Sequence, residues 1–91
     1  MPTLQREERN FQARQQFGNR LRTLRNQSGW TQEQLAELIG KTVEHVSFLE
    51  RGERAPSFEV LLDIADVFHI SPAQLFGGQV RSSPSEVWVV S

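Results

Sequence analysis

The hydrophobic positions of this 91-residue chain recur at helical spacing in several short blocks. Phe17, Leu21 and Leu24 stand four and three residues apart, which is the spacing of one helix face. Later blocks are separated by Gly, Ser, Thr and Pro, residues that begin and end helices. The apolar residues expected to face the core are Leu35, Ala36, Leu38 and Ile39, then Val46 and Leu49, then Phe58, Leu61, Leu62, Ala65 and Phe68, and last Ala73, Leu75 and Phe76. This pattern predicts a compact all-α fold of five helices.

Two of the predicted helices lie within residues 31–50 and are joined by a very short turn. Thr31 is a suitable N-cap, and Gln34 follows it at the spacing of a capping box. Gly40 is placed to end the first helix, and Thr42 is placed to cap the second. The turn is too short for antiparallel helices to lie side by side, so the two must cross at a large angle. This is the arrangement of a helix-turn-helix, whose second helix can enter the major groove of DNA.

The order of several short phrases resembles the phage-repressor and Cro-type (Xre-like) helix-turn-helix family of bacterial DNA-binding regulators. Within residues 17–77 these phrases are Phe-Gly-Asn-Arg-Leu-Arg-Thr-Leu-Arg, Trp-Thr-Gln-Glu-Gln-Leu-Ala, Phe-Leu-Glu-Arg-Gly and Ile-Ser-Pro-Ala-Gln-Leu-Phe. The resemblance implies a repressor-type domain and a transcriptional regulator that binds double-stranded DNA as a homodimer. It places the helix of residues 42–51 in the major groove of a palindromic operator.

The resemblance also assigns roles to individual residues. The base-reading side chains would be Thr42, Val43, Glu44, Ser47 and Phe48, and the phosphate contacts would be Thr31, Gln32, Lys41, His45, Arg51 and Arg54. Arg25 and Glu50 correspond to a family pair that joins the first and third helices as a structural ion pair. Apart from Arg51 at its end, which the resemblance assigns to a phosphate, the second motif helix lacks the Arg, Asn or Gln that reads guanine or adenine bidentately. Glu44 toward a cytosine amino group and Val43 toward a thymine methyl are the remaining base contacts, while Phe48 either reads bases or packs on apolar neighbours.

The sequence divides into residues 1–16, a helix-turn-helix domain over 17–78, and a tail over 79–91. Residues 1–16 are mostly polar and form either an arm, which reaches around DNA or a partner subunit, or an extension of the first helix. In the tail, Val87-Trp88-Val89-Val90 has the β-propensity of a strand; the alternatives are that it docks on the domain, pairs with a second subunit, or is disordered. Dimer contacts are expected at Ile70, Leu75, Phe76, Val87, Trp88 and Val89.

Composition adds mainly exclusions. The chain has no cysteine and only two histidines, so we expect no disulfide, no metal site and no cofactor. It has neither a signal peptide nor a membrane-spanning segment, which predicts a cytoplasmic protein without membrane contact. Residues 1–30 hold six arginines against two glutamates, whereas the net charge of the whole chain is −1. This asymmetry neither establishes nor excludes a nucleic-acid partner.

Two other classes of function are alternatives to a regulator. An antirepressor or antitoxin type of protein-interaction module would use the same exposed surface, with Glu44 and Phe48 meeting a basic partner. An enzyme is not expected, because the chain has no cysteine nucleophile, no glycine-rich phosphate loop and no arrangement of Ser, His and carboxylate.

Overall fold

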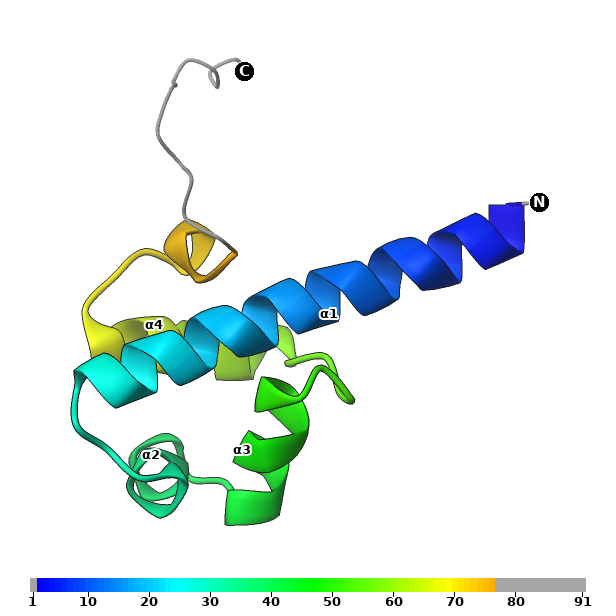
Figure 1. The fold of residues 1–91 in the computed structure, drawn as a ribbon. Coiled ribbons are helices and arrows are strands. Elements are labelled where there is room, and N and C mark those ends of the chain that lie inside the picture. Colours follow the sequence, from blue (N-terminus) through cyan, green and yellow to red (C-terminus); the bar gives the residue numbers. More distant parts are fainter. Residues whose placement is uncertain (1, 77–91) are drawn as a thin grey trace.

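The computed structural model describes residues 2–76, which form four α-helices followed by one 3-10 helix (Figure 1). The elements are α1 (Pro2–Gln27), α2 (Gln32–Ile39), α3 (Val43–Glu50), α4 (Phe58–Phe68) and η1 (Pro72–Leu75). The all-α prediction is confirmed for the described residues, but the prediction of five α-helices was wrong, since the last segment is a single 3-10 turn. The predicted strand at residues 87–90 lies outside the described residues. Within residues 2–76, none of the helices has the length and apolar character needed to cross a membrane.

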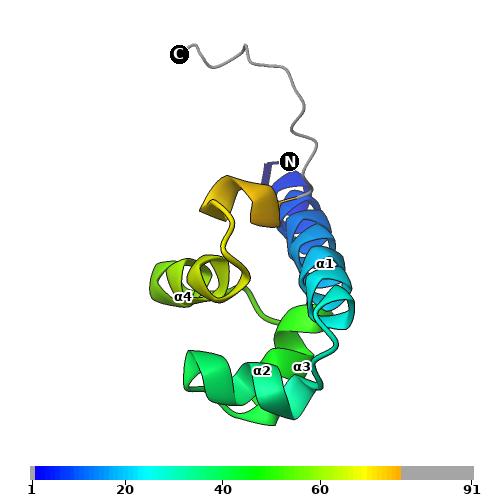
Figure 2. The same ribbon diagram turned by 90° about the vertical axis from the view of Figure 1, so that its left-hand side faces the viewer.

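Helix α1 is much the longest element, and its N-terminal half extends past the other helices (Figure 1). Seen from its end, α1 has the remaining helices gathered on one side (Figure 2). It is continuous from Pro2 to Gln27, so the segment before Phe17 is helical from residue 2 onward. Among the α1 side chains that the structure describes, from residue 6 onward, the first hydrophobic one in the core is Phe17, whereas Phe11 is 49% exposed.

Helices α2 and α3 begin and end where the capping residues stand. Thr31 Oγ1 accepts a hydrogen bond from the Gln34 backbone N–H (3.0 Å), and Gln34 Oε1 accepts one from the Thr31 N–H (2.8 Å). Gly40 ends α2 with φ of 70°, a left-handed conformation that side chains with a Cβ rarely adopt. Thr42 Oγ1 then accepts from the His45 N–H at 3.1 Å and caps α3. The predicted capping box and both predicted caps are therefore confirmed.

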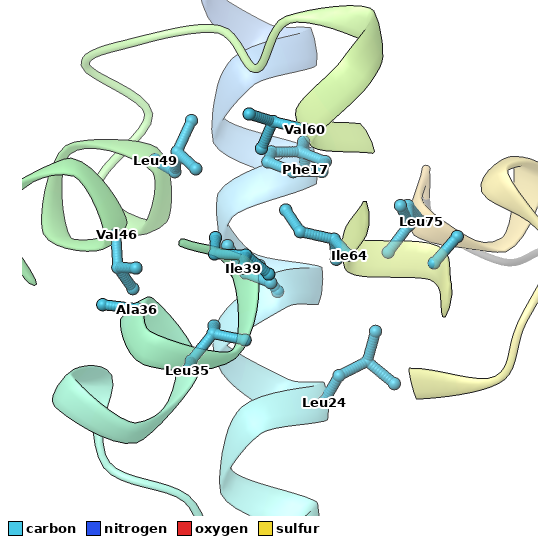
Figure 3. Close-up of a cluster of buried hydrophobic side chains, with 12 residues drawn as sticks. Phe17, Leu24, Leu35, Ala36, Ile39, Val46, Leu49, Val60, Ile64 and Leu75 are labelled. Carbon is cyan, nitrogen blue, oxygen red and sulfur yellow. The ribbon is translucent and has the colours of Figure 1, made fainter. Parts of the chain in front are cut away.

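The hydrophobic core lies where α1, α2, α3, α4 and η1 converge (Figure 3). Its buried members are Phe17, Leu21, Leu24, Leu35, Ala36, Ile39, Val46, Leu49, Val60, Ile64, Ala65 and Leu75. Five residues predicted to face the core were assigned wrongly: Leu38, Phe58, Leu62 and Phe76 are 52%, 73%, 39% and 46% exposed, and Ala73 is exposed as well. Each helix buries one stripe only, and in α4 this stripe is centred on Val60 and Ile64, which turns Leu62 outward.

Gly18 allows α1 to approach the end of α3 very closely. A Cβ atom at this position would lie 2.5 Å from the backbone oxygens of both Leu49 and Glu50. Backbone oxygens cannot move aside as a flexible side chain can, so an added methyl group would push the two helices apart.

We therefore expect Gly18→Ala to destabilise the domain, even though alanine favours the helical conformation over glycine by about 1 kcal/mol. The overpacking should outweigh this gain and lower the free energy of unfolding by about 1–3 kcal/mol, measured by urea denaturation. Asn19→Ala, at the next and exposed position of α1, is the control and should change stability little. A Gly18→Ala variant more stable than the wild type would show that the crossing is looser than the structure indicates.

Candidate nucleic-acid interface

A helix-turn-helix presents the N-terminus of its first helix and the outer face of its second to the same side. Here these are the N-terminus of α2 and the face of α3 turned away from Val46 and Leu49, which are fully buried. The predicted base-reading residues lie on this outer face of α3 or at its start, where Glu44 and Thr42 are exposed and Val43, Ser47 and Phe48 are partly exposed. The structure therefore leaves all five side chains at least partly exposed along α3 or at its start.

A buried ion pair holds these two helices in place relative to α1. Arg25 Nε lies 2.6 Å from Glu50 Oε2, Arg25 Nη2 lies 3.0 Å from Glu50 Oε1, and the Glu50 side chain is completely buried. Gln32 Nε2 donates to Glu50 Oε1 at 3.0 Å, and Arg25 Nη1 donates to the Trp30 carbonyl at 2.9 Å. The ion pair expected from the resemblance is thus present, and it also holds the first residue of α2.

The electrostatics of Glu50 follow from these contacts. Burial alone would raise the pKa of the carboxyl, but the hydrogen bonds from Arg25 and Gln32 and the charges of Arg25 and Arg22 lower it on balance. The Nε atom of Arg22 lies 3.6 Å from Glu50 Oε1, close enough for its positive charge to stabilise the carboxylate. Glu50 is therefore an ionised group inside the domain, stabilised by two arginines and one amide.

The six candidate phosphate contacts are spread over the ends of α2 and α3. Thr31 and Lys41 are exposed, and Gln32 is partly exposed with one amide hydrogen committed to Glu50. Arg51 and Arg54 are exposed beside the C-terminal end of α3. The sixth candidate, His45, is partly buried like Gln32 but differs from the other five in having a ring nitrogen enclosed.

The Nε2 atom of His45 is buried and has no hydrogen-bond partner among the described residues. Burial, followed by the positive charges of Arg54 and Lys41, lowers the pKa of this imidazole below its usual value. His45 is therefore neutral near pH 7 and does not present a positive charge to a phosphate through this nitrogen.

Phe48 carries an arginine cluster that the sequence pattern did not indicate. The Arg51 guanidinium carbon lies 5.3 Å from the centroid of the Phe48 ring, and that of Arg54 lies 5.2 Å from it. Arg51 Nε and Nη2 donate to the two carboxylate oxygens of Glu53 at 3.0 and 3.2 Å, and Nη1 donates to Ser47 Oγ. The hydrogen bonds from Arg51 lower the pKa of the Glu53 carboxyl, so the pair is charged.

Two residues of α1, which the sequence did not indicate, form hydrogen bonds with the backbone at the C-terminal end of α3. Arg14 Nε donates to the Gly52 carbonyl at 2.9 Å, and Gln15 Nε2 donates to the Arg51 carbonyl at 2.7 Å. They satisfy carbonyl groups that the end of α3 leaves without an intrahelical donor. No local pattern could have found these contacts, because they join residues 36 and 38 positions apart.

The predicted dimer contacts are only partly available. Leu75 is completely buried in the core and has no exposed surface to offer to a partner. Ile70 is partly buried and packs against the core, whereas Phe76 is 46% exposed with its ring centroid 5.8 Å from that of Phe17. Val87, Trp88 and Val89 lie outside the described residues.

The fold and the exposed face of α3 define a helix-turn-helix protein of the class that binds DNA. Comparison with known proteins agrees, because the helix-turn-helix family profile matches residues 21–75. The chain is 41% identical over 59 residues to the uncharacterized HTH-type transcriptional regulator YazB of Bacillus subtilis, covering 65% of this chain and 86% of YazB. It is 37% identical over 60 residues to the competence pilus inhibition repressor of Acinetobacter baylyi, covering 66% of this chain and 54% of the repressor.

A solved structure supports the same conclusion. The restriction-modification controller protein C.AhdI from Aeromonas hydrophila superposes with a TM-score of 0.66 at 41% identity, covering 69% of this chain and 96% of C.AhdI. The chain belongs to the helix-turn-helix family of transcriptional regulators, which are DNA-binding proteins and not enzymes.

Because Glu50 has a lower pKa in the folded than in the unfolded chain, its ionised form stabilises the fold above its ordinary pKa of 4.5. This contribution is lost as the pH falls through the folded-state value. We expect Glu50→Gln to lower the free energy of unfolding at pH 7 by up to about 3–5 kcal/mol, as when one partner of a buried ion pair is removed. The difference from the wild type should narrow below about pH 4, measured by urea denaturation at several pH values.

Glu53→Gln is the matched control, since the Arg51–Glu53 pair is exposed and should contribute little to stability. If the stability of the wild type and of Glu50→Gln fell in parallel through the acid range, Glu50 would not be a buried ionised group with a lowered pKa.

Proposed function

We propose that this regulator binds an inverted-repeat DNA operator as a homodimer, with α3 in the major groove and the N-terminus of α2 on the phosphate backbone. The observation that carries the proposal is the outer face of α3, held at a defined angle to α2 by the buried carboxylate of Glu50. A rigid frame of this kind allows side chains at the start of the helix to meet base edges.

The base-reading surface is formed by Thr42, Val43, Glu44 and Ser47. Thr42 Oγ1 and Ser47 Oγ each accept one hydrogen bond within the domain, so both hydroxyl groups retain a proton to donate to a base. Glu44 can accept a hydrogen bond from the amino group of cytosine, and Val43 offers an apolar surface to a thymine methyl.

The phosphate-binding groups are Thr31, Gln32, Lys41 and Arg54. Gln32 donates one amide hydrogen to Glu50 and so keeps the second for a phosphate oxygen, in a position fixed by the first bond. It stands at the N-terminus of α2, where the helix dipole and the free backbone N–H groups attract an anion. These contacts set the register of the protein on the duplex, whereas α3 reads its sequence.

A homodimer would place two copies of α3 about 34 Å apart, in successive major grooves. Phe76 is the described residue best suited to the dimer contact, because its ring is exposed at the edge of the core beside Phe17. Ile70 and residues 87–89 would add to this contact. The alternative of a protein-interaction module is not favoured, since the relatives named above are regulators and a repressor.

The test is selection of binding sites from a random duplex DNA library at low salt, followed by titration of the selected sites with salt. We expect an enriched inverted repeat whose affinity falls steeply as salt rises, because each phosphate contact releases counterions. Enrichment of no sequence, together with a shallow salt dependence, would overturn operator binding.

In the same assay, Gln32→Ala and Arg54→Ala should weaken binding to all sequences alike. Removal of the charged Arg54 side chain should also reduce the slope of log affinity against log salt by about 0.9 for each phosphate that it neutralises. Arg20→Ala is the control, because Arg20 Nε donates to the Gln74 carbonyl in η1, away from α3. An Arg20→Ala effect as large as that of Arg54→Ala would show that the DNA lies elsewhere.

Phe76→Ser should weaken self-association, measured by sedimentation equilibrium, because it removes an exposed aromatic side chain from the proposed dimer contact. Phe58→Ser removes the same side chain from α4, where it is 73% exposed, and should leave association unchanged. If Phe58→Ser is the variant that dissociates, the subunit interface lies on α4 instead.

A further inference from the structure

We propose that Arg51 reads a guanine in each half-site of the operator, and that Glu53, Ser47 and Phe48 position its guanidinium for this contact. The proposal rests on the operator-binding function above and goes beyond it. It names a specificity-determining residue where α3 itself offers no arginine, asparagine or glutamine for bidentate base contacts.

The first argument is the direction of the Arg51 side chain. Arg51 is the C-cap residue of α3, a position from which a long side chain can extend into the following loop or fold back along the helix. The structure shows it folded back, because Nη1 donates to Ser47 Oγ and the guanidinium lies 5.3 Å from the Phe48 ring. Ser47 and Phe48 both belong to the outer face of α3, so the guanidinium lies on the surface that meets the bases.

The second argument is the set of hydrogen bonds that remains available. A guanidinium has five N–H donors in a rigid plane, and three of them are used by Glu53 and Ser47. Glu53 occupies the edge formed by Nε and Nη2, where its two carboxylate oxygens accept two bonds. Each terminal nitrogen therefore keeps one N–H with no partner among the described residues. A pair of parallel N–H donors matches O6 and N7 of guanine.

The third argument is the difference between Arg51 and Arg54. Both guanidiniums lie against the Phe48 ring, yet Arg54 makes no ion pair among the described residues. Arg54 keeps a full unshared charge, which suits a phosphate. Arg51 has its charge compensated and its plane fixed by Glu53, which suits recognition by shape and hydrogen bonding more than attraction to the backbone. Phe48 thus acts through the arginines as a positioning residue.

The experiment compares wild type, Arg51→Ala, Arg51→Lys, Glu53→Gln and Arg54→Ala, each as the whole 91-residue chain, by base preference at each operator position and by salt dependence. Arg51→Ala should abolish a guanine preference at one position of each half-site, a loss of roughly 5- to 150-fold in discrimination. Arg51→Lys keeps the charge but not the planar donor pair, so it should lose the same preference while nonspecific affinity stays near the wild-type value. Helical content and thermal unfolding of each variant confirm that it is folded.

The Glu53→Gln variant tests whether Glu53 positions the Arg51 guanidinium for its contact with guanine. Removing the negative charge of Glu53 should tighten binding to every sequence to a similar extent, so the guanine preference is the informative measurement. If Glu53 positions Arg51, Glu53→Gln should weaken the guanine preference; if the preference stays at the wild-type value, Glu53 does not position Arg51 and the proposal is overturned. It is also overturned if Arg51→Ala weakens all sequences equally and reduces the salt slope as Arg54→Ala does. In both cases wild-type operator binding remains, whereas a wild type that selects no sequence refutes the operator function itself.

Discussion

The carboxylate of Glu50 is the group on which the geometry of this domain depends most. It is completely buried at the end of α3, and it binds Arg25 of α1 and Gln32 of α2 at 2.6–3.0 Å. A buried ion pair of this kind is worth little net stability compared with apolar packing, but an incomplete one is costly. The three helices are therefore stable only in the arrangement that satisfies the carboxylate. This arrangement sets the angle between the two helices that would meet DNA.

The close crossing of α1 and α3 also helps to fix the position of α3. Gly18 lets the backbones approach, and Arg14 and Gln15 on the preceding turn donate to the carbonyls of Gly52 and Arg51. The end of α3 and its following loop are thus held by α1 in addition to their own local hydrogen bonds. Because the loop carries Glu53 and Arg54, α1 indirectly positions the charged groups at this end of the interface.

The proposed DNA-binding surface carries few uncompensated positive charges, so its binding depends on how its side chains are oriented. Lys41, Arg51 and Arg54 share this surface with the carboxylates of Glu44 and Glu53. Since opposite charges share the surface, we infer that specificity comes from oriented side chains and not from charge alone. The cluster of Phe48, Arg51, Arg54 and Glu53 is the part of the surface in which orientation is most fully determined by neighbouring groups.

The sequence by itself determined the all-α class, the positions of α2 and α3 and their caps, because these follow from local spacing and from hydrogen bonds within a single turn. The prediction of core-facing residues failed for Leu38, Phe58, Leu62, Ala73 and Phe76, since an apolar residue beside a buried stripe has the same local pattern whether it is covered or exposed. Only the tertiary structure decided that Leu75, expected both in the core and at a dimer contact, lies wholly in the core, that His45 is partly buried, and that Arg51 lies on Phe48 and pairs with Glu53. These outcomes depend on how separate elements pack and how loops direct side chains, and neither is encoded in local periodicity.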